Sequence, residues 1–144
     1  MRERNDWILS DMIETRVEQK PDLDVLTFEH LSLDGGATAD EVRTYADLHT
    51  NANRIAAALV RYGMQRGDRF ALMMRNHPEY VEAMIAASIT ACVFVPIDPR
   101  TRGEKLAYML RKAGCCGVIC AKTGDTNRSK TTQAFRRTLF IGIF

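Results

Sequence analysis

The stretch Arg69-Phe70-Ala71-Leu72-Met73-Met74-Arg75-Asn76-His77-Pro78-Glu79 decides the fold of this chain. After Arg69 it holds an unbroken apolar run, the pattern of a strand that is buried on both faces of a sheet. Asn76 can cap a following helix, and Pro78 suits the first helical position, where no N–H is needed. A buried strand that turns sharply into a helix predicts the first half of a strand–helix–strand unit.

The same alternation continues along the chain. The expected elements are a helix from Pro78 through Ser88, a buried strand over Cys92 to Ile97, a helix opened by a capping box of Thr101 and Glu104 and ended by Gly114, and a strand over Gly117 to Ala121. Strand and helix alternating with short turns predict a parallel sheet with right-handed crossovers. The fold class is therefore α/β, with a parallel βαβαβ core.

An N-terminal helix and a β-hairpin are expected before this core. Asp6 can cap a helix that begins at Trp7, and Pro21 ends that segment. Val25 to Glu29 is a strand candidate, and the glycine-containing loop after it leads to a short strand over Val42 to Thr44. We expect the second strand to return antiparallel to the first.

The helix that follows Thr44 is the most strongly specified element. Thr44 and Asp47 form a capping-box pair at its start, and Gly63 suits a left-handed residue at its end. One face carries an apolar stripe at helical spacing, made of Tyr45, Leu48, Ala52, Ile55, Leu59 and Tyr62. This stripe predicts that the helix packs directly on the sheet, with Ile55 and Leu59 facing it.

Composition narrows the functional class. The chain has 144 residues, of which 46% are hydrophobic and 26% charged, with a net charge of +2. These values are ordinary for one globular domain, and no basic block indicates a nucleic-acid partner. The N-terminus lacks the apolar core of a signal peptide, and no stretch has the apolar length of a membrane span. The expected location is the cytoplasm.

The cysteine pattern favours free thiols in a reducing compartment. The four cysteines are Cys92, Cys115, Cys116 and Cys120. All four lie in or beside apolar runs, no Cys-x-x-Cys pair is present, and the three histidines are not spaced as zinc ligands. We therefore expect neither a metal site nor a disulfide.

Five motifs occur in a characteristic order. They are Thr44-Tyr45-Ala46-Asp47-Leu48, Ala52-Asn53-Arg54-Ile55-Ala56-Ala57-Ala58-Leu59, Gly67-Asp68-Arg69, Asn76-His77-Pro78-Glu79 and Val95-Pro96-Ile97-Asp98-Pro99-Arg100. None is diagnostic alone, but together they resemble the N-terminal part of the AMP-forming acyl-CoA synthetase and adenylation family. The resemblance is clearest from Thr44 to Cys120. It implies that the chain is an incomplete piece of the large N-terminal domain of such a ligase.

The resemblance divides the chain into two parts. Residues 1–121 are expected to form the truncated N-terminal segment of the ligase domain. Residues 122–144 are expected to be a divergent tail, made of a loop and then an apolar run, Leu139 to Phe144. That run is interpreted either as a further strand of the sheet or as the kind of tail that a frameshift or truncation leaves.

The implied reaction joins a carboxylate to coenzyme A at the expense of ATP, giving acyl-CoA, AMP and pyrophosphate. ATP, Mg²⁺ and coenzyme A are therefore implied for the full-length family. Its phosphate-binding loop, Thr-Ser-Gly-Thr-Thr-Gly-x-Pro-Lys-Gly, and its catalytic lysine do not occur in this sequence. We expect no catalytic residue, no cofactor bound by this segment alone and no ligase activity. The stretch Pro96 to Lys105 favours a bacterial acyl-CoA ligase, of the carnitine type. The alternative is a non-enzymatic truncated product or small binding module.

Three side chains are candidates for ligand contacts. Arg100 follows a predicted strand end, and the resemblance places this edge near the coenzyme A nucleotide, so Arg100 or Arg128 is expected to pair with a phosphate. His77 lies at a strand-to-helix junction, where α/β sheets bind ligands. Each also has a plain interpretation, as a surface arginine or a solvent-facing helix start. A dinucleotide-binding loop is excluded because no glycine follows Met74.

One position departs from the family pattern. Ala91 stands where the family usually has glycine, between a predicted helix and the following strand. If this position is left-handed, alanine costs about 1 kcal/mol relative to glycine.

Overall fold

The computed structural model describes residues 3–29, 40–121 and 139–143. The elements run in the order α1 (Leu9–Gln19), β1 (Asp24–Phe28), β2 (Glu41–Thr44), α2 (Tyr45–Arg61), β3 (Arg69–Met73), α3 (Pro78–Thr90), β4 (Val93–Pro96), α4 (Gly103–Ala113), β5 (Cys115–Ala121) and β6 (Leu139–Ile143). Strand and helix alternate from β3 to β5, which confirms the predicted βαβαβ unit.

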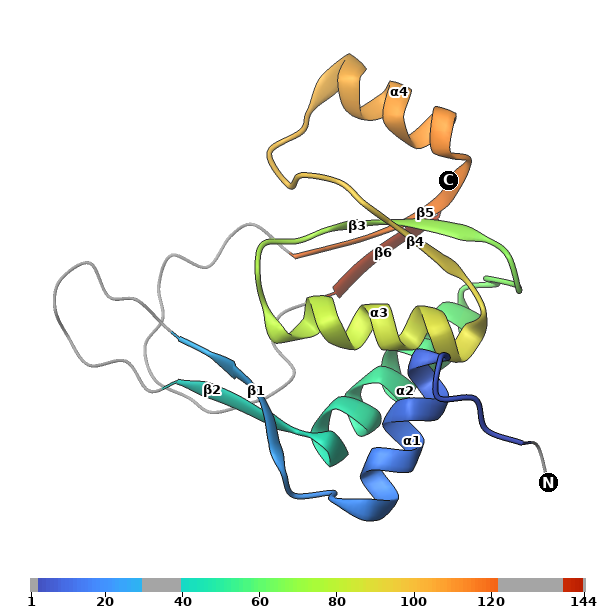
Figure 1. Ribbon diagram of the computed structural model, residues 1–144. Helices are drawn as coiled ribbons and strands as arrows, with labels where there is room; N and C mark the ends of the chain where they lie inside the picture. The colour runs from blue at the N-terminus through green and yellow to red at the C-terminus, as the bar shows by residue number, and fades with distance from the viewer. Residues whose placement is uncertain (1–2, 30–39, 122–138, 144) are drawn as a thin grey trace, which may run out of the picture.

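The main sheet has the strand order β4-β3-β5-β6 (Figure 1). β3 pairs in parallel with both β4 and β5, and β6 pairs antiparallel with β5. The chain steps from β3 to β4 through α3, then passes back beyond β3 to β5 through α4. The helices α1, α2 and α3 lie on one side of the sheet, and α4 lies on the other. The sheet is therefore doubly wound.

The N-terminal helix and hairpin form as expected, with one shift. β1 and β2 pair antiparallel in a separate two-stranded sheet. The prediction that Asp6 caps a helix from Trp7 is wrong, because α1 begins at Leu9 and its N-cap Ile8 makes no side-chain bond. A turn occupies the preceding residues: the Asn5 carbonyl accepts from the Ile8 N–H at 2.8 Å, and the Asp11 carboxylate accepts from the Asn5 N–H at 3.0 Å.

The capping box at the start of α2 is confirmed. The Thr44 hydroxyl accepts from the Asp47 N–H at 3.1 Å, and the Asp47 carboxylate accepts from the Thr44 N–H at 3.0 Å. The cap fixes the helix start and so the direction of the apolar stripe, whose central members Leu48, Ala52, Ile55 and Leu59 are buried. Tyr62 departs from the stripe and is 50% exposed, because it lies one residue past the end of the helix.

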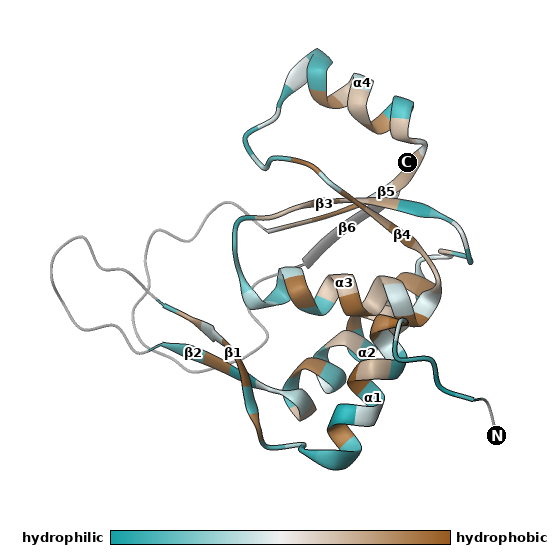
Figure 2. Cartoon of the chain, viewed as in Figure 1, coloured by the Kyte–Doolittle hydropathy of each residue, from teal (hydrophilic) through white to brown (hydrophobic). Residues whose placement is uncertain are grey.

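α3 lies at the centre of the molecule, between the sheet and the layer formed by α1 and α2 (Figure 1). Two apolar clusters meet on it. The first joins α2, α3 and the sheet, and includes Leu59, Phe70, Leu72, Ala83 and Ile119. The second joins α1, α2 and α3, and includes Ile13, Leu48, Ala52 and Ile85. In Figure 2 the strands β3, β4 and β5 are largely apolar in colour, whereas the turns leading into α3 and α4 are hydrophilic. Ile55 and Leu59 belong to the cluster that includes the sheet residues Phe70 and Leu72, as predicted. The expectation that α2 as a whole packs directly on the sheet is not met, because α2 packs mainly against α3.

Two helix starts differ from expectation by a residue or two. The N-cap of α3 is His77 rather than Asn76, although Pro78 occupies the first turn as expected. The capping box of Thr101 and Glu104 is wrong, because α4 begins at Gly103 with Arg102 at its N-cap and no side-chain cap bond. The Thr101 N–H donates to the Asp98 carbonyl at 2.9 Å, so Thr101 belongs to the turn after β4 and lies two residues before the helix start.

Among the described strands, β4 lies at one edge of the main sheet, and Pro96 shapes that edge. The N–H groups of Val93 and Ile97 donate toward β3, to the carbonyls of Asp68 and Leu72, at 2.8 and 3.1 Å. Strand residues alternate in direction, so the backbone groups of Phe94 and Pro96 point away from β3. Proline has no N–H, and the outer edge of β4 therefore offers one donor fewer than an ordinary strand.

Ala91 has the left-handed conformation that its position suggested, with φ 53° and ψ 30°. It is the C-cap of α3, and its N–H donates to the carbonyl of Ser88 at 3.3 Å. The left-handed region brings Cβ close to the backbone, so alanine is strained here where glycine is not.

We predict that Ala91→Gly stabilises the chain by about 1 kcal/mol, because glycine adopts the left-handed region without a Cβ clash. Urea unfolding followed by circular dichroism measures the change. The matched control is Ala57→Gly, on an exposed helical position of α2, which should instead cost about 1 kcal/mol. Equal or lower stability of Ala91→Gly would contradict the strain argument.

Leu59 and Thr44 should differ in their contributions to stability. Leu59 is fully buried at 0% exposed, and truncating such a leucine to alanine costs about 2–5 kcal/mol. Thr44→Ala removes a helix cap and should cost about 1 kcal/mol. Denaturant melts of the two variants rank the effects. A melt of Leu59→Ala that matches the parent would show that the core assignment is wrong.

Candidate functional site

The winding of the sheet indicates where a ligand site belongs. β4 and β5 lie on opposite sides of β3, and the chain reverses its direction of travel between them. Open α/β sheets bind ligands beyond the carboxyl ends of their strands at such a reversal. The corresponding position here is the carboxyl end of β3 next to that of β5. Residues 122–138, which follow β5, lie outside the described part of the chain.

Three polar residues follow β3 at this edge. Arg75 and Asn76 are exposed, and His77 is half-buried at the start of α3. His77 has an extended backbone, and its carbonyl accepts from the Tyr80 N–H at 3.0 Å. The structure thus places His77 at the strand-to-helix junction where the sequence predicted it.

Arg100 lies beyond the end of β4 and is 84% exposed in its side chain. Its guanidinium pairs with the carboxylate of Asp98, with Nη2 and Oδ2 2.7 Å apart, and its backbone N–H also donates to that carboxylate at 2.8 Å. The Arg100 side chain lowers the pKa of Asp98 to about 2. Arg100 is therefore at a strand end, as predicted, but already has an anionic partner. Arg128, the other predicted contact, lies outside the described residues.

All four cysteines are free thiols in the structure. Cys92 is buried, and Cys116 lies on the sheet-side core with its Sγ 3.4 Å from the Sδ of Met64. Burial raises the pKa of the Cys115 thiol, which keeps it protonated and unreactive. Within residues 3–29, 40–121 and 139–143, no group of three or more histidine, cysteine or acidic side chains is placed to hold a metal ion. In the same residues no helix is long and apolar enough to cross a membrane.

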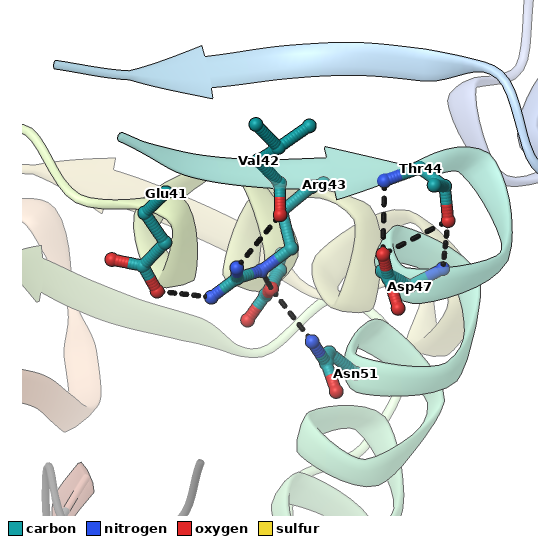
Figure 3. Close-up of polar contacts among 7 residues, drawn as sticks. Glu41, Val42, Arg43, Thr44, Asp47 and Asn51 are labelled. Atoms are coloured by element: carbon teal, nitrogen blue, oxygen red, sulfur yellow. Dashed lines mark hydrogen bonds and ion pairs between the residues drawn. The ribbon is translucent and has the colours of Figure 1, made fainter. Parts of the chain in front are cut away.

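Sequence analysis missed a buried ionic cluster on α3. Glu82 is 3% exposed, and its Oε1 accepts from Nε of Arg43 at 3.0 Å and from Nδ2 of Asn51 at 2.8 Å (Figure 3). The Nη2 of Arg43 also donates to Glu41 at 2.5 Å. One signal was present in the sequence. Glu82 precedes the buried Ile85 by one helical turn, so it is a charged residue on an apolar helix face.

Burial governs the charge state of this cluster. It raises the pKa of Glu82, and the hydrogen bonds from Asn51 and Arg43 offset only part of that rise. Arg43 serves two carboxylates at once, those of Glu41 and Glu82. Together the three side chains carry one excess negative charge in a largely buried place, which favours proton uptake by Glu82.

An apolar cavity of about 240 Å³ lies near this cluster, between α1, the hairpin, α2 and α3. It is lined by Leu9, Met12, Ile13, Val25, Leu26, Tyr45, Leu48, Val81, Met84 and Ile85. The lining continues the second apolar cluster, and the Tyr45 phenol is the only hydroxyl among these ten lining side chains.

The doubly wound sheet, with a strand reversal at its carboxyl edge, defines an open α/β domain of the ligand-binding type. Comparison with known proteins then identifies the family. The sequence model of the AMP-binding enzymes matches residues 13–140. The chain therefore belongs to the AMP-binding enzyme family. Its fold is that of a part of the N-terminal domain of adenylate-forming ligases.

Its relatives include both peptide synthetases and acyl-CoA ligases. Surfactin synthase subunit 2 of Bacillus subtilis is 38% identical over 99 residues, which are 69% of this chain and 3% of that protein. The mitochondrial medium-chain acyl-CoA ligase of Rattus norvegicus is 29% identical over 84 residues, which are 58% of this chain and 14% of the ligase.

Solved structures share the fold. The fatty acid AMP ligase of Legionella pneumophila superposes with a TM-score of 0.68 at 24% identity, over 78% of this chain and 19% of that one. The inhibitor-bound N-terminal domain of FACL13 from Mycobacterium tuberculosis gives a TM-score of 0.66 at 28% identity, over 78% of this chain and 26% of that one. The chain thus spans only a small part of the proteins that it matches.

The raised pKa of Glu82 makes a prediction about pH. In the folded state Glu82 holds its proton above the ordinary glutamate value of 4.5, so the folded state binds more protons than the unfolded state in that range. The contribution of Glu82 to the free energy of unfolding therefore falls as pH rises above 4.5, and becomes constant once Glu82 is ionised in both states. Glu82→Gln should lack this fall.

Urea melts from pH 4.5 upward, compared between the parent and Glu82→Gln, isolate the effect from that of other carboxylates. Glu104→Gln, an exposed change on α4, serves as control and should follow the parent. A constant difference between the parent and Glu82→Gln across this range would show that the Glu82 pKa is not raised.

Proposed function

We propose that this chain is the opening segment of an adenylate-forming acid–thiol ligase and supplies scaffold rather than catalytic groups. The family match over residues 13–140 carries the proposal. The described residues build a packed βαβαβ platform, and the 144 residues lack the phosphate-binding loop and the catalytic lysine that adenylation uses. Transfer chemistry at phosphorus needs backbone donors and cations around the phosphates, and this segment does not assemble them.

The reaction proposed for the whole enzyme begins with a carboxylate and ATP, which give an acyl-adenylate and pyrophosphate. Coenzyme A then displaces AMP to form the thioester, and Mg²⁺ accompanies the nucleotide. An acyl-CoA product is supported by the stretch Pro96 to Lys105 and by the similarity to acyl-CoA ligases. An amino acid activated for a peptide synthetase is the competing substrate, supported by the similarity to surfactin synthase.

Arg100, and with it Arg128, is proposed to contact the nucleotide of coenzyme A. The position of Arg100 beyond a strand end supports this role, since a guanidinium there can bind a phosphate bidentately. Because Arg100 pairs with Asp98, a phosphate would have to replace that carboxylate.

The division into residues 1–121 and a divergent tail also stays a prediction. The free thiols support a reducing compartment, and we propose the cytoplasm.

The alternative is a non-enzymatic truncated product or small binding module. Under this alternative the chain acts by binding alone and needs no phosphate-binding loop, a motif that does not occur among the 144 residues. The two proposals differ in what lies beyond residue 144: the coding DNA read onward in three frames should show the loop motif if the ligase proposal is right.

We predict that the isolated chain releases no pyrophosphate from ATP. ATP–pyrophosphate exchange is measured with the purified chain over a panel of fatty acids, small carboxylates and amino acids. A full-length adenylate-forming ligase in the same assay gives the positive control. Exchange equal to the buffer blank is expected throughout. Carboxylate-dependent exchange by the pure chain would overturn the scaffold role.

A further inference from the structure

The β1–β2 hairpin is an arm whose position needs an explanation. Figure 1 shows it extending from the start of α2, away from the main sheet. Val25 and Val42 are exposed, and Leu26 supplies an apolar contact with the second core cluster. A two-stranded hairpin is marginally stable by itself in water, so contacts with the helices must fix where the arm lies.

Arg43 makes the polar contact between this arm and α3. It leaves β2 next to Thr44, the N-cap of α2, and its Nε donates to the buried Glu82 at 3.0 Å (Figure 3). Asn51 of α2 donates to the same oxygen of Glu82 at 2.8 Å. One carboxylate oxygen therefore joins the hairpin, α2 and α3.

Burial makes this contact selective for one position of the arm. A buried ion pair is seldom a net source of stability, because desolvation offsets the attraction between the charges. Separating the pair is nevertheless costly, since Glu82 must then either keep a buried charge without its cationic partner or take up a proton. The pair therefore discriminates among arm positions more strongly than it stabilises the folded domain.

Glu41 gives the Arg43 guanidinium a second carboxylate partner, which it can keep when it is separated from Glu82. Its carboxylate accepts from Nη2 of Arg43 at 2.5 Å and lies on the same strand, so it moves with the arm. When Arg43 leaves Glu82, the guanidinium keeps Glu41 as its partner and is not left alone. Glu82 in turn keeps Asn51 and can take up a proton.

We propose that Arg43 and Glu82 form a releasable latch that holds the β1–β2 hairpin against α3, and that opening the latch frees the hairpin while the main sheet stays folded. The latch is a conformational device of this chain and goes beyond the scaffold role proposed above. The latch fixes the position of the hairpin and adds little to the stability of the domain. Its loss should therefore increase local opening of the hairpin more than it lowers the free energy of unfolding.

Hydrogen exchange followed by mass spectrometry tests the latch on the full chain. Arg43→Gln and Glu82→Gln each remove one charge of the pair. Amides in peptides spanning 23–29 and 40–45 should exchange about tenfold faster in both variants, whereas the β3 peptide 69–74 should change by less than about twofold. Arg4→Gln is the control, because Arg4 pairs with the exposed Glu18, and its hairpin should exchange like the parent's.

Two results would overturn the proposal. Unchanged exchange in the hairpin peptides would show that the pair does not hold the arm. Acceleration of the β3 peptide by the same factor as the hairpin would show a general loss of stability instead of local release. If Arg43→Gln does not fold, Arg43→Lys takes its place. Lysine keeps the charge without the fork that spans both carboxylates, so its hairpin exchange should lie between those of the parent and Glu82→Gln.

Discussion

The burial of α3 on two sides is the constraint on which the rest of the structure depends. The helix packs against the sheet through residues such as Ala83 and against α1 and α2 through Ile85. No residue of α3 is fully exposed, so the helix must be enclosed by its neighbours. α2 encloses it by presenting one continuous apolar stripe, from Leu48 to Leu59, to both clusters. The order of the strands follows, because α3 occupies one face of the sheet and leaves the other to α4.

Sequence reasoning recovered the elements whose signals are local. The capping box of Thr44 and Asp47 and the apolar run after Arg69 each specify their own backbone, and both have the structure they predicted. Helix starts that depend on a competing turn were misplaced. Thr101 has the chemistry of a cap, but it lies in a turn closed on the Asp98 carbonyl, and α4 begins only at Gly103. No periodicity in the sequence reports how far that turn extends.

The candidate site was only partly accessible to the same reasoning. Strand alternation was enough to place His77 and Arg100 beyond strand ends, because in a parallel sheet those positions share one edge. The pairing of Arg100 with Asp98 and the ionic cluster at Glu82 were found only in the three-dimensional structure. Arg43 and Glu82 are far apart in sequence and meet only when the hairpin lies against α3, which is a property of packing rather than of spacing.

Pro96 has a consequence for how copies of this chain meet one another. The outer edge of a terminal strand carries unpaired N–H and C=O groups, and a strand from another molecule can pair with them. Such pairing extends along the edge only where donors and acceptors alternate regularly. β4 is short, and at its outer edge the N–H of Phe94 has no successor at Pro96. A strand from another molecule could accept a hydrogen bond from Phe94 but none from Pro96, so β4 is a poor site for edge-to-edge aggregation.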